Sequence, residues 1–156
     1  MAQFTANRGS FLPVAHATQV DNWVLTVLTV GMSSKVKMFG WGGRSTTSTG
    51  YRTRWGRVNN TAATTTALTV TSNNPNATSM ASVNSYATQA TIAADPTGLW
   101  AQDWNSLGGG GVIILPIGGE WLVVGGALGT LFNQIGCWNI AGAESSGSSY
   151  GVTYEE

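Results

Sequence analysis

The chain has 156 residues, which is enough for one ordinary domain with a single hydrophobic core, and a second domain is not expected. Charged residues make up only 9% of it, against about 25% in an average soluble domain, and the formal net charge is zero. The zero net charge argues against a dedicated nucleic-acid binder. The abundant Thr, Ser, Asn and Gly favour strands and turns over helices.

The first predicted elements lie before residue 31. Residues 1–10 are polar and are expected to form an N-terminal arm. Residues 11–15 predict a short strand, and Pro13, which has no backbone N–H to donate within a sheet, places it at a sheet edge or at the start of a strand. Residues 22–30 are dense in β-branched side chains and are followed by a glycine, which predicts a central strand covered on both faces.

Two segments with alternating side chains follow. Residues 35–39 alternate charged and apolar side chains, and residues 51–57 alternate as well. We expect these two segments to pair as a hairpin through the Ser/Thr-rich loop between them. In the second segment one face would carry the aromatic side chains and the other the arginines: Tyr51, Thr53 and Trp55 against Arg52 and Arg54.

The middle of the chain carries weaker patterns. Residues 64–71 predict a strand, residues 73–76 predict a turn, and one further strand is expected near residues 86–92. Trp100 and Trp104 are four positions apart, which indicates either a short helical turn or a loop that carries two partly buried indoles.

The last third is rich in glycine and in apolar runs. Two glycines separate residues 112–117 from residues 120–124, which predicts a hairpin, and residues 132–141 and 150–154 predict the last strands. The whole pattern predicts an all-β protein, a single-domain antiparallel β-sandwich or jelly roll of roughly eight to ten short strands over residues 1–156.

No membrane partner or secretion is expected. The most hydrophobic stretch, residues 107–138, is interrupted by Pro116, Glu120 and glycines, and its apolar runs are far shorter than the roughly 18 residues that a spanning helix needs. The printed sequence opens without a basic-then-apolar leader, so we expect synthesis in the cytoplasm without a signal peptide. Cys137 is the only cysteine and is interpreted as a small buried apolar residue.

Reactive side chains are sparse. His16 is the only histidine, so neither a His/Cys metal site nor a Ser-His-Asp triad is expected. The glycine runs lack the endings of phosphate-binding loops. The two carboxylates of a glycosidase could come from four acids, Asp95, Asp103, Glu120 and Glu144. Their spacing selects no pair, so solvated or capping roles are favoured. We therefore expect no enzymatic activity, no metal and no cofactor.

Two sets of side chains are candidates for binding. Arginines interleave with aromatic residues along residues 51–57, a pattern that suits either a nucleic-acid surface or a subunit contact. The zero net charge favours the subunit contact. The residues predicted to make it are Arg52, Arg54, Trp55 and Arg57. Seven tryptophans are many for this length, and most are expected in the core or in a subunit interface. Three of them stand next to loops and are the candidates for carbohydrate binding: Trp41, Trp100 and Trp104.

The two signs of charge are separated along the chain. All seven cations lie in the first 57 residues, whereas six of the seven acids lie from Asp95 onward. If the fold keeps these parts apart, it would have a basic and an acidic patch that could join subunits. If strands from the two parts interleave, the charges would mix.

The layout resembles small β-structured virion proteins of tailed bacteriophages, such as head decoration or cement proteins. Three segments carry the resemblance: the polar start that leads through residues 12–15, residues 35–41 before a Ser/Thr-rich loop, and residues 138–142 with the Ser/Gly-rich end at residues 145–156.

The resemblance implies a non-enzymatic structural protein on the virion surface, made in the host cytoplasm. Such a protein would form symmetric oligomers, with a trimer favoured, and would fasten neighbouring major capsid or tail proteins. Arg52, Arg54, Arg57 and Trp55 would make that contact. The alternative function is a carbohydrate-binding or host-receptor-binding β-sandwich module.

Overall fold

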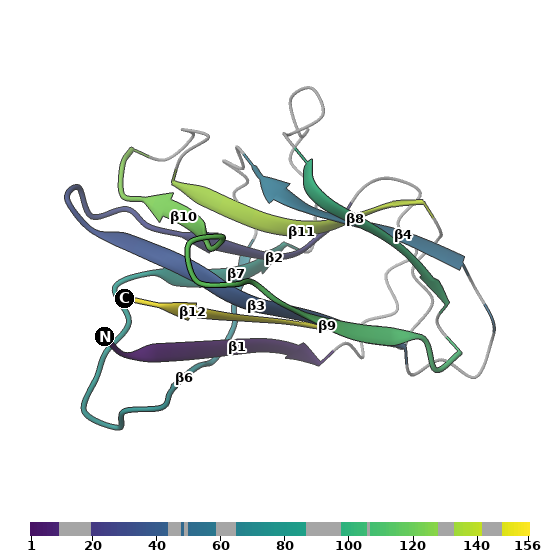
Figure 1. Cartoon of the computed structure of the whole chain (residues 1–156), viewed down its shortest axis with the longest axis horizontal. Coiled ribbons are helices and arrows are strands. Elements are labelled where there is room, and N and C mark those ends of the chain that lie inside the picture. The colour runs from purple at the N-terminus through teal and green to yellow at the C-terminus, as the bar shows by residue number, and fades with distance from the viewer. Residues whose placement is uncertain are drawn as a thin grey trace.

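The computed structural model describes residues 1–9, 20–43, 48, 50–58, 65–86, 98–105, 107–127, 133–141 and 148–156. These residues form twelve strands and no helix, arranged as two antiparallel sheets that face each other (Figure 1). Sheet A contains β1 (Gln3–Gly9), β3 (Ser33–Gly43), β6 (Val70–Ser72), β9 (Gly110–Ile114), β10 (Trp121–Val124) and β12 (Ser148–Glu155). Sheet B contains β2 (Val20–Thr26), β4 (Gly50–Arg57), β5 (Thr65–Ala67), β7 (Ser82–Tyr86), β8 (Gly98–Asn105) and β11 (Gln134–Ala141). The all-β antiparallel sandwich predicted from the sequence is confirmed.

The two ends of the chain lie side by side in sheet A. β1 pairs with β12 along its whole length, and the backbones of Ala2 and Glu156 exchange two hydrogen bonds of 3.2 Å (Figure 1). Residues 3–9 are thus a strand with β12 on one side and β6 on the other, not the N-terminal arm expected at residues 1–10. The side chains of β1 explain this, because Phe4 and Ala6 are buried whereas the alternating polar residues Gln3 and Asn7 are exposed.

β3 and β4 lie in different sheets, so the hairpin expected between residues 35–39 and 51–57 is wrong. β3 pairs with β12 and with the β9 and β10 edge, whereas β4 pairs with β11 and β8. Both strands alternate buried and exposed side chains, as the sequence predicts, but alternation does not specify the partner strand.

β9 and β10 do not pair with each other, so the expected hairpin at residues 112–124 is also wrong. Both strands pair antiparallel with β3 on the same edge: β9 with residues 38–42 and β10 with residues 33–36. They are two halves of one edge strand, interrupted by a loop at residues 115–120.

β2 is buried on both faces, as predicted, but it ends at Thr26, and Leu28 and Val30 of the strand expected at residues 22–30 are exposed. Trp23 and Leu25 belong to the core between the sheets, and Val24, whose side chain points the other way, is fully buried too. On the same outer face of sheet B, Gln134 and Trp138 of β11 are also fully buried. The outer face of sheet B is therefore covered at Val24, Gln134 and Trp138.

Three predictions for the middle of the chain change in detail. The strand expected at residues 64–71 is split at Leu68 into β5 in sheet B and β6 in sheet A. The turn at residues 73–76 is confirmed. β7 ends its described part at Tyr86, and residues 87–92 of the strand expected near residues 86–92 lie outside the described residues. Residues 98–105 form β8, neither a helical turn nor a loop.

Aromatic rings from both sheets fill the core. Trp55 of sheet B packs between Phe39 and Trp41 of sheet A, with ring centroids 5.0 and 5.1 Å away. Phe39 stacks in turn on Trp121 at 4.8 Å. Such rings bury large apolar areas, so the tryptophan content is accounted for mostly by the core.

Candidate contact surface

Trp55, one of the four residues predicted for a partner contact, is a core residue. Its side chain is fully buried and lies on the inner face of β4 with Tyr51 and Thr53, as the alternation of residues 51–57 predicts. It is therefore unavailable to a partner unless the sandwich opens.

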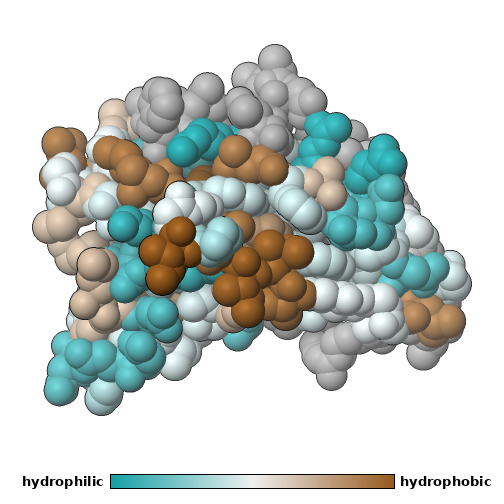
Figure 2. Space-filling model, viewed as in Figure 1, coloured by the Kyte–Doolittle hydropathy of each residue, from teal (hydrophilic) through white to brown (hydrophobic). Residues whose placement is uncertain are grey.

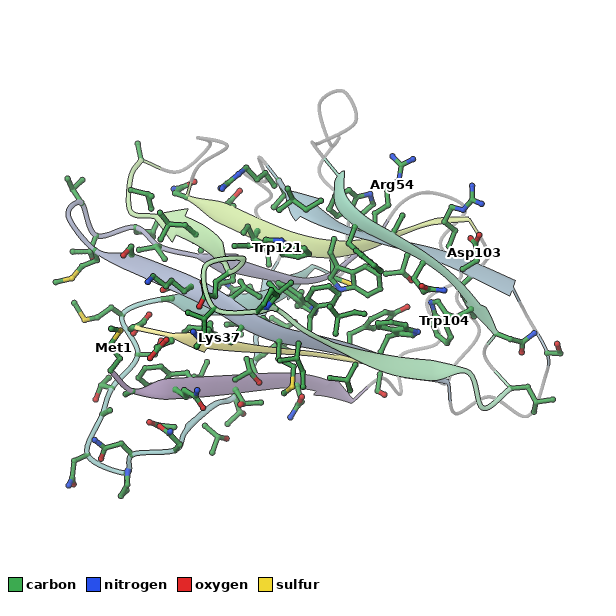
Figure 3. All side chains as sticks on the ribbon, viewed as in Figure 1. Met1, Lys37, Arg54, Asp103, Trp104 and Trp121 are labelled. Atoms are coloured by element: carbon green, nitrogen blue, oxygen red, sulfur yellow. The ribbon has the colours of Figure 1, made fainter. Side chains whose placement is uncertain are left out.

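The three arginines of β4 do not form one surface. Arg52 and Arg54 point outward from sheet B, and Figure 3 shows Arg54 directed away from both sheets. Arg57 lies on the inner face, and its guanidinium donates a 3.0 Å hydrogen bond to the carbonyl oxygen of Leu122 in sheet A. Arg57 thus bridges the two sheets at their edge, and only Arg52 and Arg54 remain on the predicted outer surface.

The three candidate tryptophans for carbohydrate binding do not form a platform. Trp104 stacks on Tyr51 at 4.9 Å, and its indole Nε1 donates a 2.8 Å hydrogen bond to Thr53 Oγ1 inside the sandwich. Trp41 packs against Trp55 and lies under Gly111, where an added Cβ would come within 2.8 Å of the indole. Trp100 alone of these three is well exposed, at 43%.

Opposite charges from distant parts of the sequence meet in the fold. Lys37 Nζ lies 2.8 Å from a Glu120 oxygen and 3.1 Å from a Glu155 oxygen. Arg52 and Asp103 form a two-pronged pair with bonds of 2.6 and 2.9 Å. These strands interleave, so the charges of the two halves are mixed at these places and do not form separate patches.

Exposed aliphatic side chains gather along the β9–β10 edge of sheet A. In Figure 2 hydrophobic atoms cover β9 and the loop that follows it. By register with β3, the side chains of β9 and β10 that are exposed point to the outer face of sheet A. We call this set the edge strip: Val112, Ile114, Ile117, Leu122 and Val124. The sequence pattern does not single out this strip, because the two segments look like a hairpin of the core.

The most exposed member of the edge strip, Ile117, is held at the tip of an ordered turn. Gly119 N donates a 2.9 Å hydrogen bond to Pro116 O, and Gly118 has a positive φ of 85°, which glycine adopts without strain. Glu120 accepts hydrogen bonds from Gly118 N at 2.7 Å and from Lys37 Nζ at 2.8 Å. The 97% exposure of Ile117 is thus built into the fold.

The ionic anchor below this turn joins one ammonium group to two carboxylates. The hydrogen bond from Lys37, aided by backbone N–H groups, lowers the pKa of the Glu120 carboxyl to about 2. Hydrogen bonds to Glu120 and Glu155 raise the pKa of Lys37 above its ordinary value. Lys37 and Glu120 therefore stay charged at neutral pH.

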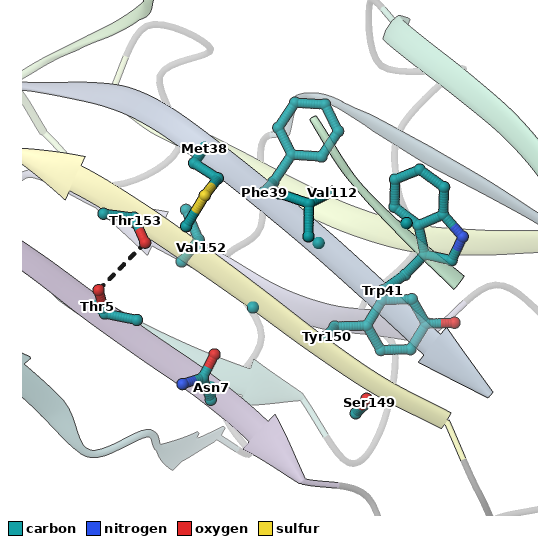
Figure 4. Close-up of a pocket in the computed structure, with 13 residues that line it drawn as sticks. Thr5, Asn7, Met38, Phe39, Trp41, Val112, Ser149, Tyr150, Val152 and Thr153 are labelled. Carbon is teal, nitrogen blue, oxygen red and sulfur yellow. Dashed lines mark hydrogen bonds between the residues drawn. The ribbon is translucent and has the colours of Figure 1, made fainter. Parts of the chain in front are cut away.

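A shallow groove of about 320 Å³ runs beside the edge strip on the outer face of sheet A (Figure 4). One row of register partners explains its shape: Val112, Gly40, Gly151 and Asn7 lie side by side across four strands. The two glycines have no side chains, so the row is hollow between Val112 and Asn7. The next row is closed by a 3.1 Å hydrogen bond between Thr5 and Thr153. None of the described residues that line the groove is charged.

The described residues contain no group of three or more metal-binding side chains, and no helix among them is long and apolar enough to cross a membrane. Asp103 and Glu120, two of the four acids considered for glycoside cleavage, are bonded to Arg52 and Lys37 respectively. His16, Asp95 and Glu144 lie outside the described part. Cys137 is fully buried, as predicted.

Comparison of the chain with protein-family models found no match. The searches of curated proteins and of solved structures gave no match either.

Proposed function

We propose that this chain is a non-enzymatic structural subunit of a virion, which acts by self-association and by binding neighbouring capsid or tail proteins at the virion surface. The observation that carries the proposal is the edge strip, a row of aliphatic side chains kept on the outside of a protein whose core is otherwise well closed. Contiguous exposed apolar surface of this kind marks contact sites in folded proteins.

The nearly uncharged surface supports the same proposal. Exposed charges are few, and two of those near the edge strip, Lys37 and Glu120, are already paired with each other. Lys35, the register partner of Leu122, is the charge that a partner covering the whole strip would have to pair or desolvate. The resemblance to phage decoration proteins supplies the class of partner.

Carbohydrate or receptor binding remains the alternative function, but one observation weakens it. A sugar platform on a β-sheet needs aromatic faces that are open to solvent, and two of the three candidate tryptophans are packed inside the sandwich. Trp100 would have to serve alone.

A sedimentation experiment tests the proposal. Virion shells prepared without this chain are mixed with the purified chain, and the bound fraction is measured after pelleting. We expect saturable binding that is reduced at least about tenfold by the double variant Ile114→Lys/Ile117→Lys, because two ammonium groups would have to be desolvated at the contact.

The control is Leu99→Lys, which places one such ammonium group at an exposed apolar residue of β8 in the other sheet. This variant should bind as the unmodified chain does. Absence of saturable binding by the unmodified chain, or saturable binding of a glycan that is lost on Trp100→Ala, would count against the proposal.

A further inference from the structure

β9 is a sheet edge whose backbone groups point outward. Leu115 N donates a hydrogen bond of 2.8 Å to Lys37 O, and Gly43 N donates one of 2.6 Å to Gly109 O. Bonded and non-bonded pairs alternate in an antiparallel ladder. The N–H and C=O groups of Gly110, Val112 and Ile114 must therefore point away from β3, and among the described strands none pairs with β9 on that side.

β9 also lacks the features that normally protect an edge from pairing with another chain. Protected edges are short, or carry charges or proline. Within the described sheets, the edge strands β5 and β6 have three residues each, and the edge strand β8 carries Asp103. β9 has five residues, none of them charged or proline.

The sequence around β9 is complementary to itself when it runs antiparallel. With a two-fold axis at Val112, Ile114 of one copy lies opposite Gly110 of the other, where the absent side chain leaves room. The turns that flank β9 carry two more exposed aliphatic side chains, Ile117 and Leu107, the latter exposed by 57%. Within β9 itself, Ile114 is thus matched by a glycine and Val112 by its own copy.

We infer that a second copy of this chain binds at β9, adding an antiparallel strand through a two-fold axis at Val112 and joining two A sheets into one. The inference rests on the self-association part of the proposed function and names the contact. It predicts a two-fold contact, not the three-fold contact that the resemblance to decoration proteins implies.

The contact area is at the lower limit for a specific dimer. Taking about 100 Å² for a fully exposed aliphatic side chain, Leu107, Val112, Ile114 and Ile117 offer roughly 300 Å² per copy. With the backbone of the added strand included, the total comes close to the roughly 1,000 Å² of small specific interfaces. The zero formal net charge adds no long-range repulsion, so we expect a reversible dimer that depends on concentration.

Cysteine cross-linking tests the register directly. In the inferred dimer the Cα atoms of the two Val112 residues are about 5.5 Å apart, within the range that a disulfide spans. The two Ile114 residues are roughly 14 Å apart along the strands, which a disulfide cannot span. Both positions are exposed, and the native Cys137 is buried and does not compete.

We expect Val112→Cys to form a disulfide-linked dimer under mild oxidation by copper phenanthroline, at least about tenfold faster than the matched control Ile114→Cys. Equal rates for the two variants would overturn the inferred register. The solution mass by light scattering should shift from one to two chain masses as the concentration of the unmodified chain rises. A mass that stays at one chain, or a trimer that Val112→Pro leaves intact, would overturn the inference.

Val112→Pro is chosen because it removes an N–H that points away from β3, so it costs no hydrogen bond within sheet A. It should shift the monomer–dimer equilibrium toward monomer by at least about tenfold in concentration. If the Val112→Pro chain is monomeric but still binds virion shells, the dimer contact is upheld and shell binding does not require it. A dimeric chain that binds no shells would uphold the contact and count against the virion role.

Discussion

Lys37 Nζ and Glu120 Oε1 lie 2.8 Å apart and join β3 to a residue 83 positions later in the sequence. Glu155 of β12 completes the anchor at 3.1 Å from the same ammonium. Since Glu120 also accepts a hydrogen bond from Gly118 N, this single carboxylate connects the central strands of sheet A to the turn that displays Ile117.

We expect Glu120→Gln to lower the free energy of unfolding at neutral pH. The free energy of unfolding of this variant should also change less with pH in the acidic range. The carboxyl pKa is about 2 in the folded chain, below its ordinary value of 4.5. The stability that the carboxylate contributes is therefore complete above about pH 4.5 and is lost as the pH falls toward about 2. Urea unfolding of both chains across this range should show two curves that converge in acid.

Asp103→Asn is the matched control for this prediction, because Asp103 is also bonded to a cation but its pair with Arg52 is far more exposed. Solvent screens such pairs, so this change should alter the stability less than Glu120→Gln does. If the two changes have equal effects, the Lys37 anchor contributes no more than an ordinary surface pair.

The sequence was sufficient to predict the fold class and most of the strands, because alternation and β-branched residues report local conformation. The strand partners were not predictable in this way. Residues 112–117 and 120–124 look like a hairpin since glycines separate them. In the structure, however, both segments pair with β3 and not with each other. The choice between a hairpin and one interrupted edge strand depends on β3, which lies some 75 residues earlier.

The site was only partly predictable for the same reason. Alternation along residues 51–57 correctly separated Trp55 from Arg52 and Arg54, but placing all of them in one contact ignored that separation. Whether Trp55 faces the core or a partner depends on Phe39 and Trp41 in the opposite sheet. The edge strip could have been suspected from residues 110–114, which lack the charges that a lone edge usually carries.

Thr53→Val should reduce the free energy of unfolding by about 1–3 kcal/mol, the usual effect of leaving a buried donor without its acceptor. Trp104 Nε1 donates to Thr53 Oγ1 in a site that water does not reach. Thr5→Val is a suitable control, because the Thr5–Thr153 bond is only partly buried and water can replace it. Urea unfolding followed by tryptophan fluorescence measures both effects, and equal losses would contradict the buried hydrogen bond.

Tyr154 should ionise only at strongly alkaline pH. Burial raises the pKa of its phenol to about 12, and its hydroxyl lies 2.7 Å from Ser79 Oγ. The unfolded phenol ionises near pH 10, so the stability contributed by burying the neutral form is complete below about pH 10 and is lost as the pH rises toward about 12. The ultraviolet titration of the chain minus that of Tyr154→Phe isolates this group, and a difference that rises near pH 10 would show that Tyr154 is open to solvent.

Trp100 and Trp104 share one face of β8 but should respond very differently to truncation. Trp104 is stacked on Tyr51 and hydrogen-bonded within the sandwich, so Trp104→Ala should cost about 3–5 kcal/mol of stability. Trp100 is 43% exposed on the edge strand of sheet B, so Trp100→Ala should cost about 1 kcal/mol or less. Urea unfolding compares the two variants, and a Trp100→Ala loss as large as that of Trp104→Ala would mean that Trp100 is a core residue.

If the chain binds a glycan at all, that affinity should vanish in Trp100→Ala while the fold persists, because Trp100 is the most exposed indole of the three candidates.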